Sequence, residues 1–424
     1  MISCPSWVTI QKIIEHVIVT LLAFLFAALL AGLSLSLPFL NPVARSLADF
    51  SLIDIYFQAM HDAQEPDESH IITIVDISDV HDRSRIADMI DSINQAQPAV
   101  VAFDVIFDGL QGDEEGSMTL LEKIGEVETP RFAYMMRDYD PERQSFTTML
   151  RSFFNVDDLN LEGYVNTPES TSGHAIRTFS LQRVFLGDTL PSFAVQIVSA
   201  YNSQFTPAPT HGHTIGFTPV DAPSSSTLDL INPSDELLKD HIIDFTPTLF
   251  PVVPYNQIGH ATDLLRDHIV LVGATRDLVD THVTSVGRMS GVNLIAYKVQ
   301  TLLENKNIHY ASSFLQWLIT FLLVFATQVW NYYLYNHITH SQRGFWKFGA
   351  VSQTYMGIAN TLWLVLITFG NFLVFQQLNV SFDMLWLLMA IAFCTTASGC
   401  YKGVVTVIAR RYPNSICARS VYCE

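Results

Sequence analysis

The stretch IITIVDISDVHDRSRIADMIDSINQAQPAVVAFDVIF, residues 71–107, decides the fold of the large middle region of this chain. Residues 71–77 and 99–107 are rich in β-branched and aromatic side chains, a composition that predicts strands. Residues 84–95 between them place apolar side chains at helical spacing. These apolar residues are Ile86, Met89, Ile90 and Ile93. The stretch therefore predicts a βαβ unit, whose right-handed crossover makes its two strands parallel.

Further segments extend this unit into a larger domain. Residues 268–272 (HIVLV) have the pattern of a buried strand, and residues 292–304 predict a helix with an apolar face. A helix is also predicted over residues 193–201, and short strands are predicted over residues 131–136, 163–167, 175–181, 213–218, 227–231 and 242–245. We expect an α/β domain with a mixed sheet.

The composition indicates that part of the chain lies in lipid. Of 424 residues, 49% are hydrophobic and only 15% are charged, and the mean hydropathy is +0.26. Soluble domains carry about a quarter of charged residues. The formal net charge is -18, and nearly all the acidic residues lie between Pro38 and Ser312. Because this acidic region repels nucleic acid, no nucleic-acid partner is expected.

Four apolar segments are long enough to cross a bilayer as helices, one before the acidic region and three after it. The first could also be read as a cleaved signal peptide, but it is longer than the usual signal core. The predicted division is residues 1–16 cytoplasmic, 17–37 first span, 38–312 external domain, 313–335 second span, 336–357 cytoplasmic loop, 358–377 third span, 383–401 fourth span and 402–424 cytoplasmic tail.

Basic residues in the short flanks predict the orientation, since Lys and Arg collect on the cytoplasmic side of a membrane. They are Lys12 before the first span, Arg343 and Lys347 between the second and third, and Lys402, Arg410, Arg411 and Arg419 after the fourth. Both termini are therefore expected in the cytoplasm and the acidic domain outside. The polar residues inside the three later spans, such as Gln328, Asn331 and Asn371, are not ionisable, which gives a transporter no support.

Several local motifs resemble those of the type-two CHASE family, the second class of extracellular sensory domains associated with bacterial cyclases and histidine kinases. The motifs are IVDIS at 74–78, DRSRIADMIDSI at 82–93, AVVAFDVIF at 99–107, HIVLVGATRDLVDTH at 268–282 and SGVNLIAY at 290–297. The order of one span, an external domain and several further spans is also similar. Ser285 and Ser290 depart from the pattern, because the family often has prolines before its terminal helix.

The resemblance implies a multi-pass sensor in the bacterial cytoplasmic (inner) membrane, with its domain on the periplasmic or extracellular side. It also implies an unknown small molecule or envelope protein as the input, and a homodimer as the assembly. Family members are commonly followed by a cytoplasmic output module. Residues 402–424 are too few for one, so we expect relay to a separate cytoplasmic or membrane effector protein. The alternative is a non-catalytic structural subunit of a membrane assembly.

Two carboxylates interrupt the apolar strands of the βαβ unit, Asp76 and Asp104. A buried carboxylate needs hydrogen bonds or a cation, so both are expected to have specific partners. Open α/β sheets bind ligands at the carboxyl ends of their strands. The predicted ligand-binding residues there are Asp76, Ser78, Asp79, Arg83, Asp104, Asp108, Thr275 and Asp280. The alternative is a structural role, in which these groups cap turns and helices and tie strands together.

Motifs for catalysis and cofactors are missing from the sequence. It contains no GxGxxG, no GKS or GKT and no GxSxG, so we expect no catalytic residues and no cofactor. His211 and His213 form an HxH pair without a third ligand, and we expect no metal site. Asp113, Glu114 and Glu115 are interpreted as a solvated loop. An enzyme remains the less favoured alternative, since Asp76 and Asp104 could act as an acid and a base if held close together.

Overall fold

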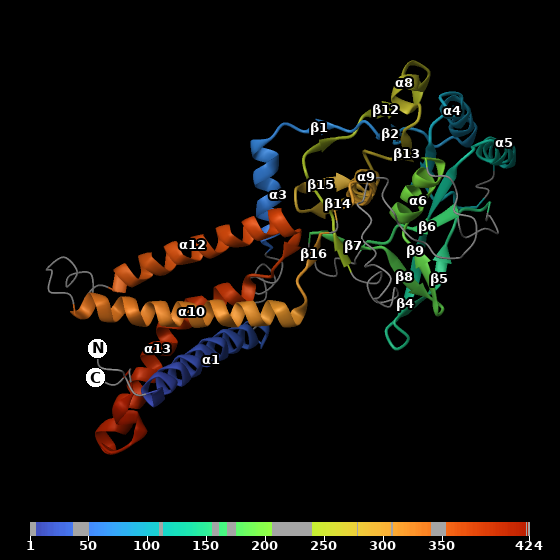
Figure 1. The fold of residues 1–424 in the computed structure, drawn as a ribbon. Helices are drawn as coiled ribbons and strands as arrows, with labels where there is room; N and C mark the ends of the chain where they lie inside the picture. Colours follow the sequence, from blue (N-terminus) through green and yellow to red (C-terminus); the bar gives the residue numbers. More distant parts are fainter. Residues whose placement is uncertain are drawn as a thin grey trace. The chain divides into compact units, whose positions relative to one another are not determined.

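The structure is a computed structural model (Figure 1). It describes residues 6–36, 51–109, 113–154, 161–167, 175–205, 240–277, 279–306, 308–340, 353–420 and 422. The predicted strands 213–218 and 227–231 and the His211/His213 pair lie outside these ranges. The chain forms two compact units, Ile53–His309 and the combination of Met1–Leu52 with Tyr310–Glu424. We call them the α/β unit and the helical unit.

The α/β unit is built on a mixed sheet, as predicted. Its main path runs in the order β12-β2-β13-β3-β4-β5-β8-β9, and β6 also pairs with β4. Parallel pairing joins β12 (Val252–Pro254), β2 (Ile72–Asp76), β13 (Ile269–Gly273), β3 (Val100–Phe103), β4 (Pro130–Asp140) and β6 (Glu162–Tyr164). Antiparallel pairing joins β4 to β5 (Ser145–Leu150) and β8 (Gln182–Phe185) to β9 (Asp188–Pro191).

The βαβ unit forms as predicted, with α4 (Arg83–Gln95) between β2 and β3. The two strands are parallel but not adjacent, because β13 lies between them. Leu271 of β13 pairs with Ile74 of β2 on one side and with Ala102 of β3 on the other. All residues of β2, β3 and β13 are buried, the pattern of central parallel strands that are covered on both faces.

Helices cover both faces of this sheet. On one face, α4 and α5 (Glu114–Gly125) pack over a core in which the rings of Phe103 and Phe132 stack with centroids 5.4 Å apart. On the other face lie α6 (Phe193–Phe205) and α9 (Gly291–Leu303). There α9 approaches so closely that a Cβ atom on Gly273 would lie 2.9 Å from the Cβ of Val292. Glycine therefore permits the contact between β13 and α9.

The prediction of a loop at Asp113, Glu114 and Glu115 was wrong. Asp113 caps α5 by accepting a hydrogen bond from the amide of Gly116 (2.9 Å), and the two glutamates lie in the first turn. Acidic side chains stabilise this end of a helix because they interact favourably with its dipole. All three side chains are exposed to solvent, as expected. Helix α3 (Leu52–Ala63) was also not predicted.

Shorter elements complete the described chain. They are β1 (Asp67–Glu68), β7 (Thr178–Ser180), β10 (Asp240–Ile242), β11 (Thr248–Leu249), η4 (Tyr255–His260), α8 (Thr262–Leu265), β14 (Thr281–Thr284), β15 (Gly287–Ser290), β16 (His309–Tyr310), β17 (Val380–Ser381) and η5 (Ile416–Arg419).

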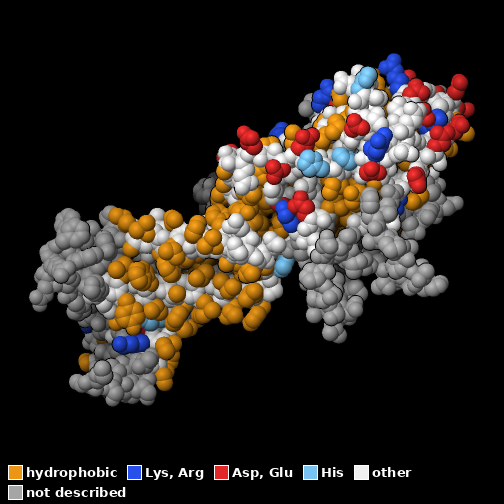
Figure 2. Space-filling view, turned by 45° about the horizontal axis from the view of Figure 1, so that its top comes forward, with side chains coloured by type: hydrophobic (Ala, Val, Ile, Leu, Met, Phe, Trp, Pro, Cys, Tyr) orange, Lys and Arg blue, Asp and Glu red, His pale blue; other side chains and the backbone are white. Residues whose placement is uncertain are grey.

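The helical unit contains four helices long and apolar enough to cross a membrane, one N-terminal and three C-terminal as predicted. They are α1 (Ser6–Ser36), α10 (Ser313–His340), α12 (Gln353–Leu378) and α13 (Leu385–Arg411). Within this unit α1 packs against α10 and α13. Apolar side chains cover much of its visible surface, whereas charged side chains gather on the α/β unit (Figure 2).

The first candidate span runs over Ile10–Gly32, so it starts earlier than the predicted Val17 and includes three ionisable residues, Lys12, Glu15 and His16. Glu15 and His16 are both buried. Gln11 donates a hydrogen bond to Glu15 (3.0 Å), and a hydrogen bond of 2.8 Å joins His16 Nδ1 to the hydroxyl of Tyr422. These partners offset the cost of withdrawing polar groups from water.

Candidate functional site

A hydrogen-bond network joins the carboxyl ends of β2 and β13. Asp76 Oδ1 accepts hydrogen bonds from the amide and hydroxyl of Ser78 (3.0 and 2.5 Å) and from the amide of Thr275 (3.1 Å). Its other oxygen, Oδ2, pairs with the guanidinium of Arg276 at 3.2 Å. Arg276 also pairs with Asp79 at 2.5 Å. Both carboxylate oxygens of Asp76 thus have partners within the protein.

This network controls the protonation of Asp76. Burial raises the pKa of a carboxyl group, but here the hydrogen bonds from Ser78 and Thr275 outweigh burial and lower it to about 2. Asp76 is therefore a charged carboxylate whose two oxygens both have partners, and it links the ends of the neighbouring strands β2 and β13. Its contacts match the structural alternative described above more closely than a ligand site.

Arg83 also has partners within the protein, on the face of the sheet covered by α4 and α5. Its guanidinium donates to Ser117 Oγ (2.5 Å) and to the carbonyl oxygens of Asp108 (3.1 Å) and Gly109 (2.6 Å), and it lies 4.9 Å from the ring centroid of Phe153. Arg83 fixes the start of α4 to the segment after β3. None of these contacts involves the carboxylates of Asp76 and Asp104.

Asp104 differs from Asp76, because the structure describes no hydrogen bond or ion pair to its carboxyl group. It follows β3 on the face covered by α9, and its Cβ lies 3.3 Å from where a Cβ on Gly273 would be. Burial raises the pKa of Asp104 to about 7, and the charge of Asp280 adds to the rise while Lys298 and His282 oppose it. Asp104 is the predicted site residue whose protonation can change near neutral pH.

Lys298 of α9 was not predicted and is the most unusual charged residue near this site. Only 5% of it is exposed, and its ammonium group forms no ion pair or hydrogen bond with any residue in the described ranges. Burial lowers its pKa to about 8, and Arg183 adds to the fall while Asp104 and Asp280 oppose it. A lysine so enclosed would be expected to have a partner, because desolvating an ammonium group is costly.

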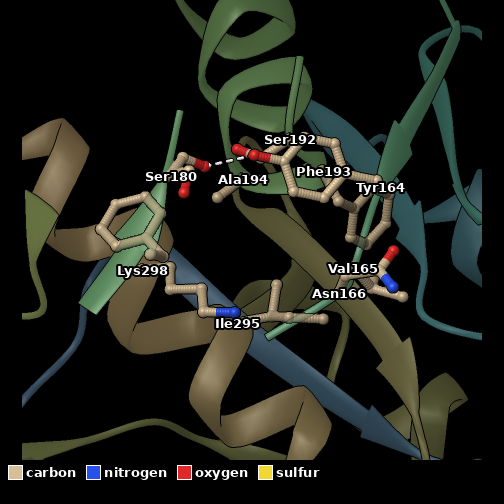
Figure 3. A pocket seen from close by; sticks show the side chains of 10 residues that line it. Tyr164, Val165, Asn166, Ser180, Ser192, Phe193, Ala194, Ile295 and Lys298 are labelled. Carbon is tan, nitrogen blue, oxygen red and sulfur yellow. Dashed lines mark hydrogen bonds between the residues drawn. The ribbon is translucent and has the colours of Figure 1, made fainter. Parts of the chain in front are cut away.

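The side chain of Lys298 extends into a small cavity between α9, β6, β7 and the first turn of α6 (Figure 3). We call it the Lys298 cavity. Its walls include Tyr164, Ser180, Ser192, Ala194, Ile295 and Lys298. The hydroxyl of Tyr164 donates to the carbonyl of Ser180 (2.6 Å), which closes one side. The cavity is small, with room for about one water molecule.

Asp280 precedes α9 in the sequence but lies against its first residue, Gly291. It forms a partly exposed pair with His282 (3.0 Å). Its carboxylate lies over Gly291, where an added Cβ would come within 2.1 Å of Asp280 Oδ2. The glycine therefore allows an acidic group to approach the N-terminus of the helix, which is favourable for the helix dipole.

The predicted site residues thus fall into three groups. Asp76, Ser78, Asp79 and Thr275 belong to one network, which Arg276 completes. Asp104 and Asp280 lie in the electrostatic surroundings of Lys298, and Arg83 with Asp108 lies on the opposite face of the sheet. Sequence reasoning missed Arg276, His282 and Lys298. Lys298 had a signal, since it stands three residues after Ile295 within an apolar helical pattern.

Metal binding finds no support in the geometry of the described ranges. They contain no group of three or more His, Cys, Asp or Glu side chains arranged to hold a metal ion.

The fold defines a class of protein in which, along the chain, an α/β unit with a mixed sheet follows one helix and precedes three further helices, all apolar enough to span a membrane. The chain matches the CHASE2 domain over residues 20–329, which is more than half of its 424 residues. It belongs to the CHASE2 domain family of extracellular sensory domains. No curated protein and no solved structure matched.

Proposed function

We propose that this protein is a sensor of the bacterial cytoplasmic membrane that binds a ligand with its external α/β unit and relays the signal to a separate effector protein. The observation that carries this proposal is the extent of the CHASE2 match, which starts within α1, covers the α/β unit and ends within α10. The match thus includes the sensory domain together with a candidate span on either side of it in the sequence.

The ligand site in this proposal is the region around Asp104 and Lys298, at the carboxyl end of β3. Both groups lack partners among the described residues, and their pKa values of about 7 and about 8 lie near neutral pH. Perturbed ionisable groups at such an edge of a sheet are typical of binding sites. We propose a binding role and not a catalytic one for these residues.

Labelling of introduced cysteines tests the orientation. In a chain whose five native cysteines are replaced, Met118→Cys in α5 (62% exposed) reports on the α/β unit and Ile416→Cys (77% exposed) on the segment after α13. A membrane-impermeant maleimide applied to intact cells should label only Met118→Cys. Labelling of Ile416→Cys alone would refute an external α/β unit.

Gentle purification of the tagged full chain from its native membrane tests the relay. A kinase, cyclase or other signalling protein should be recovered with it, and Lys298→Met should alter that protein's output without reducing its recovery. Lys306→Met is the matched control, because Lys306 is already paired with Asp244 and Glu304. Recovery of only a stoichiometric scaffold protein, unaffected by Lys298→Met, would favour a structural subunit instead.

A further inference from the structure

The Lys298 cavity combines two features that favour a negative charge. One is the ammonium group of Lys298, which points into the cavity (Figure 3). The other is the N-terminus of α6, since Ser192 and Ala194 of its first turn line the same cavity. The first turn of a helix presents amide groups and the positive end of the helix dipole to whatever lies before it.

No described group neutralises Lys298 directly. Asp104 and Asp280 act on it electrostatically, but neither forms an ion pair with it. Asp240 faces the same region and accepts a hydrogen bond from Ser180 Oγ (2.7 Å), so part of its carboxylate is already engaged. Arg183 adds a second positive charge, with its guanidinium 5.6 Å from the ring centroid of Tyr164. The cavity wall thus carries the positive charge of Lys298, and the nearby Arg183 adds to the positive potential there.

The packing around α6 holds this arrangement in place. Ser192 caps the helix, and its hydroxyl accepts a hydrogen bond from the amide of Val195 (3.4 Å). Gly163 of β6 lies directly against the first turn, where an added Cβ would be 2.4 Å from the Cα of Phe193. The cavity is therefore bounded by backbone that cannot shift easily, which is the condition for a preorganised site.

We propose that the Lys298 cavity binds the carboxylate group of a small organic acid, with one carboxylate oxygen between the ammonium group of Lys298 and the first turn of α6. The cavity has room for about one oxygen atom or water molecule, which matches one oxygen of a planar carboxylate. The inference names the ligand class of the sensor proposed above and rests on that function for its biological meaning.

Hydrogen exchange of the purified full chain in detergent tests this proposal with sodium acetate as the probe. A bulky sulfonate salt of equal ionic strength controls for screening. Acetate should slow exchange in the first turn of α6 and in α9. Where exchange requires an opening that releases acetate, the exchange rate should fall roughly tenfold at an acetate concentration of about ten times its Kd. The sulfonate should have no such effect.

Two variants make the result specific. Lys298→Met keeps an unbranched side chain of similar length and removes the charge, so acetate should no longer slow exchange in α6. Lys306→Met removes a lysine beyond the end of the same helix and should respond like the wild-type chain. The proposal is overturned if acetate slows exchange equally in Lys298→Met, or if it has no effect on the wild-type chain.

A chemical readout covers the case in which Lys298→Met does not fold. The rate at which acetic anhydride modifies Lys298 in the wild-type chain, followed by peptide mass spectrometry against pH, reports the pKa of its amino group. Acetate should raise that pKa and slow modification, because a bound anion favours the ammonium form. An unchanged pH profile in acetate would contradict the site.

The two proposals can fail separately. Acetate-dependent protection without any effector recovered from native membranes would leave the anion site in place and refute the relay. An effector whose output responds to Lys298→Met, without acetate protection, would keep the sensor and refute a carboxylate as its ligand.

Discussion

The α/β unit and the helical unit distribute apolar and polar side chains between interior and surface in opposite ways. In the α/β unit, large apolar residues such as Phe103 and Ile74 are fully buried, and charged groups lie on the outside. In the helical unit, Leu362 and Phe369 are largely exposed, whereas Thr327 and Gln328 are buried between helices. The difference indicates that water surrounds the α/β unit and lipid the helical unit, because exposed apolar side chains are favourable in lipid and unfavourable in water.

Buried ionisable groups separate the two units further. In the helical unit, both Glu15 and His16 have hydrogen-bonding partners. In the α/β unit most buried charges are also tied, as Arg83 is, but Lys298 has no partner in the described part of the chain. A buried charge without a partner identifies a place where a ligand group is expected.

The largest expected effect compares one truncation in the two units. Phe103→Ala removes a buried ring that stacks on Phe132 and should lower the free energy of unfolding of the α/β unit by about 3–5 kcal/mol. Leu362→Ala, at a side chain 65% exposed on α12, should cost less than about 0.5 kcal/mol in detergent. Pulse proteolysis of the full chain in urea measures the first, and SDS titration the second. Equal losses would contradict the assignment of two solvents.

The second effect is the pH dependence that Asp104 introduces. Its folded pKa of about 7 lies above the ordinary 3.8, so between these values the folded state keeps a proton that the unfolded chain has released. The contribution of Asp104 to the free energy of unfolding therefore falls as pH rises towards 7, by at most about 1.4 kcal/mol per pH unit. Above about pH 7 this contribution no longer changes with pH. Asp104→Asn should remove that slope in urea denaturation measured from pH 4 to 8.

Asp76 provides a control of opposite sign for this pH experiment. Its folded pKa of about 2 lies below the ordinary 3.8, so its contribution is complete above that ordinary value and is lost as pH falls towards 2. Asp76→Asn should therefore destabilise the α/β unit throughout the neutral range, without altering the slope between pH 4 and 7. Identical pH profiles for Asp76→Asn and Asp104→Asn would contradict the different surroundings of the two carboxyl groups.

A smaller effect concerns the paired charges of the α/β unit. Arg177 pairs with Asp54 through two nitrogens, at 2.8 Å from Nε and 2.5 Å from Nη2, and both side chains are mostly buried. Arg177→Met should cost about 2 kcal/mol, since it leaves a mostly buried carboxylate without its charged donor. Lys123→Met removes an exposed pair with Glu126 and should stay within about 1 kcal/mol. A double-mutant cycle of Arg177→Met with Asp54→Asn measures the coupling.

The smallest effect tests the polar interior of the helical unit. Gln328 donates to the carbonyl of Cys394 (3.1 Å) and accepts from the hydroxyl of Ser398 (2.9 Å), joining α10 to α13. Gln328→Leu should lower resistance to SDS unfolding by about 1 kcal/mol, the usual size of such bonds between membrane helices. A matched Leu366→Gln, at an exposed position of α12, should instead reduce insertion. A Gln328→Leu chain more stable than wild type would contradict the role of this contact.

Local patterns predicted the elements of the fold but not their neighbours in the sheet. The strands β2 and β13 and the helices α4 and α9 could be read from runs and periodicities in windows of about ten residues. The position of β13 between β2 and β3 could not, because chain order does not determine strand order. Helix α5 was missed because its acidic start was interpreted as a solvated loop, whereas those residues cap the helix and begin its first turn.

The candidate site shows the same limit. Sequence reasoning identified Asp76 and Asp104 because carboxylates in apolar strands are conspicuous, but it could not tell that one is saturated and the other is not. That difference depends on Arg276, which is brought to Asp76 from a distant part of the chain, and on the absence of such a partner for Asp104 among the described residues.

The sequence by itself determined the α/β class and the four apolar segments, since length and periodicity act within a single segment. It also indicated the family through local motifs. Only the tertiary structure decided that Lys298 and the first turn of α6 share one cavity, and that Glu15 and His16 find partners inside the helical unit. The physical reason is that burial and pairing are properties of residues distant in sequence, which packing alone brings together.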